Sequence, residues 1–173
     1  TLLAAIEAWG LDKALQASTG MFALALWDTQ EKSLQLARDR FGEKPLYYGW
    51  IGNAFAFASE LKALHAVPGY SLRINREALA LYMRFCYVPS PFCIHQDIYK
   101  LEPGCVLKLN GAVPATPAGP PMPGASHGGV SVRRWWSFRH TAAAGLDNPL
   151  HDEAEALAEL EQVLSNAVSR QCL

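Results

Sequence analysis

The sequence predicts an α+β fold built on antiparallel strands. Two apolar hairpins follow each other between residues 21 and 58, and segments with helical periodicity lie before and after them. Successive strands joined by short turns pair antiparallel. Half of the 173 residues are hydrophobic and 18% are charged, a composition typical of a globular protein with a packed core.

Two short helices precede the first hairpin. Apolar residues recur at helical spacing from Leu2 to Leu15, and Gly10 divides the pattern. Met21–Trp27 is rich in aromatic and aliphatic residues and predicts a strand. After the polar turn Thr29–Lys32, Leu34 and Leu36 alternate with polar residues, which predicts a half-buried partner strand.

The second hairpin comprises strands at Leu46–Trp50 and Ala54–Ala58. Gly52-Asn53 lies between them, and both residues tolerate the positive φ of a tight turn. Beyond this hairpin the periodicity predicts helices at Glu60–Ala66, Arg76–Phe85 and Asp152–Gln171, and a late strand at Cys105–Leu109.

Composition changes at Asn110. From there to Ser131 the chain has five prolines and five glycines, and such a segment buries too little apolar surface to offset its ordering cost. It predicts a linker or loop at residues 110–131 between a domain at 1–109 and a further segment at 132–173. In that segment, burial of Trp135 and Trp136 would anchor the chain.

Charge and hydropathy argue against two classes of partner. The formal net charge is -1, without the basic excess of a nucleic-acid binder. No apolar run reaches the length of a membrane span. The cysteines lack the paired spacing of zinc sites, so we expect reduced, buried thiols and a cytoplasmic protein. They are Cys86, Cys93, Cys105 and Cys172.

The most distinctive segment is Ala37–Tyr48, which predicts a strand end, a charged hairpin turn and a strand start. Asp39 can accept hydrogen bonds from amides two residues ahead, Gly42 can adopt positive φ, and Pro45 sets the direction of the next strand. The cations of this turn are expected to be exposed. Ser59 is expected to cap the helix that follows.

Structural roles are predicted for every candidate residue, and no catalytic, substrate-binding or metal-binding residue is assigned. A role at a domain interface is the alternative. The candidates are Arg38, Asp39, Arg40, Gly42, Lys44, Pro45, Ser59 and Glu60.

Several blocks resemble, in order and spacing, the glutamine-hydrolysing asparagine synthetase family. They are Gly20–Asp28, Ala37–Tyr48, Phe57–Leu64, Tyr87–Gly104, Trp136-Ser137 and Leu160–Gln171. The resemblance implies that residues 1–109 are the C-terminal portion of an N-terminal-nucleophile (αββα) glutaminase domain. Residues 132–173 would then be the linker anchor and first helix of an α/β synthetase domain.

The resemblance implies a parent protein that hydrolyses glutamine, transfers the ammonia and amidates aspartate with ATP and Mg²⁺. Glutamine, aspartate and ATP would be its partners, and homo-oligomerisation is left open. For the candidate residues, a position along the ammonia route of this parent is a second alternative to a structural role. The family's nucleophile is a cysteine at the mature N-terminus, its glutamine site contains Asn-Gly-Glu, and its pyrophosphate loop is Ser-Gly-Gly-x-Asp-Ser. None of these stands in the chain, so we expect a piece lacking both ends, inactive alone and without a cofactor of its own.

Two alternatives stay open. The parent could amidate a different carboxylate, or the chain could be a non-catalytic remnant or interaction module. Thr1 is disfavoured as a nucleophile because it leads directly into a helical pattern. We further expect an exposed edge and an uncovered apolar face near Met21–Trp27, and hence marginal stability and aggregation of the isolated chain.

Overall fold

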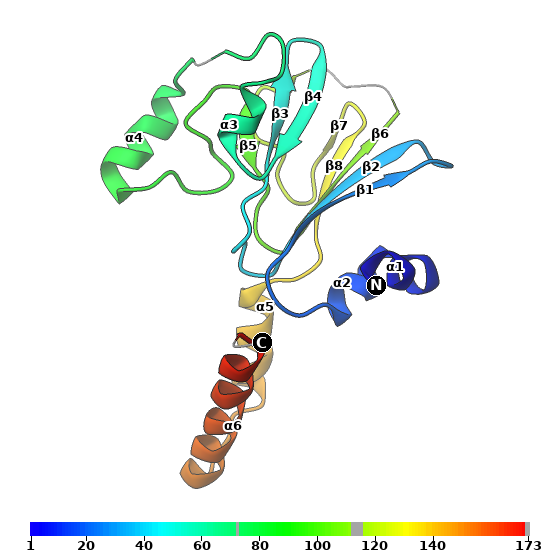
Figure 1. Ribbon diagram of the computed structural model, residues 1–173. Helices are drawn as coiled ribbons and strands as arrows, with labels where there is room; N and C mark the ends of the chain where they lie inside the picture. Colours follow the sequence, from blue (N-terminus) through cyan, green and yellow to red (C-terminus); the bar gives the residue numbers. More distant parts are fainter. Residues whose placement is uncertain (72, 112–115, 172–173) are drawn as a thin grey trace. The chain divides into compact units, whose positions relative to one another are not determined.

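The computed structural model describes residues 1–71, 73–111 and 116–171, which form two compact units divided between Ser137 and Phe138 (Figure 1). No helix in these ranges is long and apolar enough to cross a membrane. The elements of the first unit are α1 (Leu2–Trp9), α2 (Leu11–Ala17), β1 (Ala23–Asp28), β2 (Ser33–Arg38), β3 (Tyr47–Ile51), β4 (Ala54–Ala58), α3 (Leu61–Leu64), α4 (Arg76–Phe85), β5 (Ile98–Lys100), β6 (Cys105–Asn110), β7 (Ser126–His127) and β8 (Val130–Arg134). Those of the second are α5 (Phe138–Asp147) and α6 (Glu153–Gln171).

The larger sheet has five antiparallel strands in the order β1-β2-β6-β8-β7. β2 is an interior strand, paired with β1 on one side and β6 on the other. The prediction that it is half-buried is wrong, because Leu36 on one face and Ala37 on the other are both fully buried. Helices cover one face of this sheet and the second sheet covers the other.

The smaller sheet has three antiparallel strands in the order β4-β3-β5. Both predicted hairpins are confirmed, but they belong to different sheets. β1 and β2 lie in the larger sheet, whereas β3 and β4 lie in the smaller one. The segment from Asp39 to Leu46 is therefore a connection between sheets, and its prediction as a hairpin turn is wrong.

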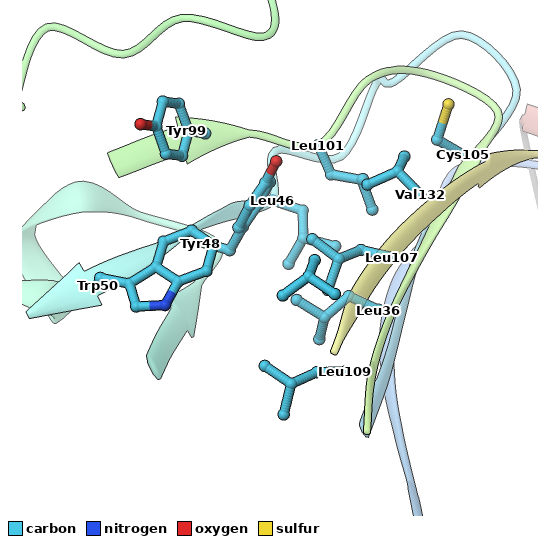
Figure 2. Packing of buried hydrophobic residues seen from close by; sticks show 11 residues of the cluster. Leu36, Leu46, Tyr48, Trp50, Tyr99, Leu101, Cys105, Leu107, Leu109 and Val132 are labelled. Carbon is cyan, nitrogen blue, oxygen red and sulfur yellow. The ribbon is translucent and has the colours of Figure 1, made fainter. Parts of the chain in front are cut away.

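The main core lies between the two sheets. Leucines of the larger sheet, with Leu36 and Leu107 among them, face the aromatic rings of Tyr48, Trp50 and Tyr99 on the smaller sheet (Figure 2). Strand alternation explains why these leucines face the core, since every second residue of β2 and β6 points to this side. The rings of Tyr48 and Trp50 meet edge to face, with centroids 6.3 Å apart.

Helices cover the outer faces. Leu11 and Leu15 of α2 pack with Ala37 and Val106 on the larger sheet. Leu64 of α3 packs against the outer side of the smaller sheet. The layers of the first unit are therefore helices, sheet, sheet and helices, a mixed fold with antiparallel sheets as predicted.

The Pro/Gly-rich segment contains more structure than the sequence predicts. β7 and the start of β8 fall within residues 110–131, where a linker or loop is expected. Val130 and Val132 are buried against the sheet core, and this burial explains why β8 forms so close to Gly128 and Gly129. Pro114 of this segment and Cys172 lie outside the described residues.

The second unit consists of α5 and α6. The helix predicted over Asp152–Gln171 is confirmed, and α5 was not predicted. A carboxylate oxygen of Asp152 accepts a hydrogen bond from the amide of Glu155 at 2.8 Å, which satisfies one free donor at the start of α6. Leu157, Leu160, Leu164 and Val168, which recur at helical spacing along α6, are exposed.

Candidate functional site

The carboxylate of Asp39 organises the connection between the sheets. Asp39 follows the last residue of β2, is 1% exposed, and accepts three backbone hydrogen bonds. Its Oδ1 takes the amide of Glu43 at 3.0 Å, and its Oδ2 takes the amides of Lys44 at 3.0 Å and Phe22 at 3.3 Å. The predicted bond to amides two residues ahead is replaced by bonds four and five residues ahead, because the connection is wider than a hairpin turn.

Arg38 also stabilises the connection between the sheets, through hydrogen bonds from its guanidinium to backbone carbonyls. Its guanidinium donates to the carbonyls of Lys44 at 2.8 Å and Leu101 at 2.6 Å, and also to the carbonyl of Gly42. Arg38 is 8% exposed, so the prediction of an exposed cation is wrong for this residue. Burial lowers the pKa of the guanidinium, and the charge of Asp39 opposes that shift.

Both the backbone conformation at position 42 and the space around it require a glycine there. Its φ is +69°, in the left-handed region, and an added β-carbon would lie 2.8 Å from Cγ of Pro103. Lys44 takes part through its backbone amide and carbonyl, while its side chain and Pro45 are exposed. The structure thus brings together Arg38, Asp39, Gly42 and Lys44, as the sequence predicts for one turn. We call these four residues the inter-sheet clamp.

Arg40 acts on a different element. Its guanidinium donates to the carbonyls of Ser18 at 2.6 Å and Gln16 at 2.8 Å, at the C-terminal end of α2. These carbonyls lack partners within the helix, and a cation is favourable at that end. The guanidinium also lies 5.0 Å from the centroid of a ring of Trp135. Arg40 therefore joins α2 to the chain after β8.

Trp135 and Trp136 anchor that part of the chain, as predicted, although their link to the clamp was not predicted. Nε1 of Trp135 donates to the carbonyl of Arg38 at 3.2 Å, and its ring stacks on Phe22. The ring of Trp136 meets Phe41 with centroids 5.0 Å apart. Only the aromatic-basic composition of residues 133–136 could have indicated these contacts, which join positions almost one hundred residues apart.

Ser59 and Glu60 lie apart from the clamp, at the start of α3. The N-cap of α3 is Glu60, which makes no side-chain capping bond, so the predicted capping role of Ser59 is wrong. Glu60 instead pairs with Lys62 at 2.6 Å, and both side chains are exposed. An exposed ion pair of this kind contributes little to stability.

The clamp is suited to holding backbone in place. The three oxygen contacts of Asp39 and the three donor contacts of Arg38 all go to main-chain groups. Within the described ranges, no group of three or more His, Cys, Asp or Glu residues is placed to hold a metal ion. The geometry indicates a scaffold that fixes one sheet to the other.

Comparison with known proteins gives this scaffold a context. Residues 1–116 match the family described as "Glutamine amidotransferase domain". The chain is 42% identical over 93 residues to asparagine synthetase [glutamine-hydrolyzing] 1 of Bacillus subtilis, which covers 54% of this chain and 15% of that protein. It is 27% identical over 155 residues to asparagine synthetase [glutamine-hydrolyzing] 3 of the same organism, covering 88% of this chain and 21% of that protein.

A provisionally named asparagine synthetase of Methanocaldococcus jannaschii is 41% identical over 85 residues, which are 48% of this chain and 16% of that protein. The chain thus spans about a fifth or less of the length of these relatives. Residues 1–116, which match the family, include the hairpins of both sheets and all four residues of the inter-sheet clamp.

Proposed function

The chain belongs to the glutamine amidotransferase family, and from this premise we propose that it is part of an ATP-dependent, glutamine-hydrolysing asparagine synthetase. The parent protein would release ammonia from glutamine and use it to amidate aspartate. The observation that carries the proposal is the match of residues 1–116 to the amidotransferase domain, together with the similarity of the chain to proteins named as asparagine synthetases.

Residues 1–109 would be the C-terminal portion of the glutaminase domain. The succession of helices, antiparallel sheet, antiparallel sheet and helices supports an N-terminal-nucleophile fold for this portion. Residues 110–131 would connect it to the synthetase domain, and residues 132–173 would carry the anchor and first helix of that domain. The structure divides the chain between Ser137 and Phe138 and places β7 and β8 in the first unit, so of residues 132–173 the segment from Phe138, with α5 and α6, is the part that would lead into the synthetase domain.

The role of this chain in the parent would be structural. Arg38 and Asp39 fix the backbone between β2 and β3, and thereby fix the spacing of the two sheets on which a glutaminase site would be built. The nucleophilic cysteine and the Asn-Gly-Glu segment expected of the family are not among the 173 residues. We therefore propose that the chain alone is inactive.

ATP and Mg²⁺ would be bound elsewhere in the parent. The chain has no Ser-Gly-Gly-x-Asp-Ser segment, and the described residues hold no acidic or histidine cluster fit for a cation. No residue of this chain is therefore assigned to either group. Free thiols at Cys86, Cys93 and Cys105 support a reducing, cytoplasmic location for the protein.

The deciding experiment compares the 173-residue chain with the complete protein encoded at the same locus. Glutamate release from glutamine and ATP-dependent formation of asparagine are measured for both. We expect both activities in the complete protein and neither in the chain. A complete protein that hydrolyses glutamine but amidates a carboxylate other than aspartate would replace the proposed acceptor, and one without either activity would refute the enzymatic proposal.

The scaffold role is tested by Asp39→Ala in the complete protein. We expect a less stable protein with reduced glutaminase activity, because three backbone amides lose their acceptor. If folding and both activities are unchanged, the clamp does not support the site. A stable variant with normal glutaminase activity but less amidation would indicate the alternative role, at a domain interface or along an ammonia route.

A further inference from the structure

A pocket of about 450 Å³ lies on the outer side of the smaller sheet, next to α4. Its lining combines residues of the sheet and its neighbouring segment with residues of α4 and its C-cap. The first group includes Tyr47, Cys93 and Lys100, and the second consists of Leu79, Tyr82 and Cys86. The proposed function gives the residues of this pocket no role.

Strand register explains why a lysine faces this pocket. Tyr47 of β3 and Lys100 of β5 are directly opposite each other in the antiparallel pair. Their neighbours Tyr48 and Tyr99 are also paired, and these two rings lie in the core between the sheets. Because successive side chains point to opposite faces, Tyr47 and Lys100 lie on the outer face.

The ammonium of Lys100 has no carboxylate partner among the described residues. It donates to the carbonyl of Val88, and the ion pairs found in the described ranges involve other cations. Burial lowers the pKa of Lys100, the thiol of Cys93 opposes this shift, and the charge of Arg38 adds to it. Among the described residues that line the pocket, Lys100 is the charged one and none is acidic, so the floor that the sheet forms is electropositive.

The walls of the pocket are apolar and partly open. The side chains of Leu79 and Tyr82 are exposed on α4, although both are apolar or aromatic. A half-buried cation among apolar walls favours an anion that can replace its lost hydration. A phosphate would need further cations, and an amino acid would place its own ammonium on an electropositive floor. A single carboxylate with an apolar body avoids both costs.

We propose that this pocket binds a small apolar carboxylate. The carboxylate would pair with the ammonium of Lys100, and its aromatic or aliphatic body would pack against Leu79 and Tyr82. Cys86, which is exposed at the end of α4, would be covered by the bound molecule.

The first test uses 4-phenylbutanoate and its neutral analogue 4-phenylbutanamide on the 173-residue chain. Alkylation of Cys86 by iodoacetamide is followed by peptide mass spectrometry, which separates it from Cys93, Cys105 and Cys172. We expect the acid to slow alkylation of Cys86 at least fivefold at saturation and the amide to leave it almost unchanged. Equal protection by both compounds, or protection by neither, would overturn the proposal.

The second test is Lys100→Met, which keeps most of the apolar stem and removes the charge. Isothermal titration with 4-phenylbutanoate is expected to show at least tenfold weaker binding than in the unmodified chain, and Lys100→Arg is expected to retain most of it. Lys13→Met, on the exposed side of α2, is the matched control and should bind normally. Unchanged binding in a folded Lys100→Met variant would refute the role of the ammonium; if that variant is unfolded by circular dichroism, the acid-amide comparison decides.

Discussion

A β-carbon added to Gly42 would lie 2.9 Å from Cζ of Arg38. The glycine therefore leaves the space that the buried guanidinium fills while it donates to the carbonyl of Gly42 itself. One residue supplies a backbone turn with positive φ, and the other holds that turn against the smaller sheet. The connection between the sheets depends on both residues at once.

Gly42→Ala should destabilise the chain by about 2 kcal/mol or more, because left-handed strain and steric overlap act together. Urea unfolding followed by circular dichroism gives the free energy of unfolding. The methyl group would displace either the guanidinium of Arg38 or the ring of Pro103, and each displacement breaks packing or hydrogen bonds.

Gly52→Ala is the matched control for this prediction. Gly52 has φ +59° in the turn between β3 and β4, and an added β-carbon would meet nothing within 4 Å. Only backbone strain remains, which costs about 1 kcal/mol. Equal losses in the two variants would show that the close approach to Arg38 is unimportant.

Arg38→Met should cost about 3 kcal/mol of unfolding free energy, since three carbonyls lose a charged donor in a buried setting. Arg38→Lys should recover little, because a single ammonium cannot reproduce the planar fork that reaches Gly42, Lys44 and Leu101. Arg139→Met, at an exposed position of α5, is the control and should change stability by less than about 0.5 kcal/mol. A value for Arg38→Met as small as that of the control would contradict the clamp.

Local patterns were sufficient to predict most elements of the fold. Alternation and turn residues located β1 to β4 and β6, and helical periodicity located α1 to α4 and α6. β5 is only three residues long and offers too short a pattern. β8 was missed because the prolines and glycines before it dominate the composition, while its burial depends on pairing with β6.

The candidate site was predicted in position but not in chemistry. Glycine tolerates positive φ and aspartate accepts hydrogen bonds from nearby amides, so the place of Gly42 and Asp39 in a turn could be inferred from neighbouring residues alone. The burial of Arg38 could not, because one of its acceptors, Leu101, lies 63 residues further along the chain. The same holds for Trp135, whose bond to Arg38 depends on how β8 pairs with β6. Long-range contacts of this kind leave no local pattern in a single sequence.

His95 should make the stability of the chain sensitive to acid. Its Nδ1 is buried without a hydrogen-bond partner among the described residues, and its ring lies 5.8 Å from that of Tyr70 and 6.2 Å from that of His65. Burial lowers the pKa of His95, and the proximity of His65 lowers it further. The unfolded chain, with an ordinary histidine pKa of about 6.5, therefore takes up this proton first.

Stability from this residue is thus present above about pH 6.5 and is lost as the pH falls toward the lower pKa of the folded state. Thermal midpoints at pH 7.5 and pH 5.5 should differ less in His95→Gln than in the unmodified chain. His140→Gln, at an exposed position of α5, should keep the full difference. An identical pH dependence in all three proteins would exclude His95 as the source.

β1 lies at one edge of the larger sheet. Among the described strands β1 pairs only with β2, and Trp27 on β1 is 55% exposed. Trp27 is opposite Leu34, which packs against the core between the sheets, so strand register places both on the same face. The three-stranded sheet covers Leu34 better than Trp27, which leaves an apolar ring beside a free strand edge.

The isolated chain should therefore self-associate, and Trp27→Lys should reduce that association, because a charge at an edge strand opposes pairing with a second copy. Light scattering after size exclusion, at rising protein concentration, measures the mass. Trp9→Lys, at an exposed position of α1, should associate as the unmodified chain does. If the unmodified chain remains a monomer throughout and unfolds in one sharp thermal transition, the uncovered edge neither drives association nor weakens the fold.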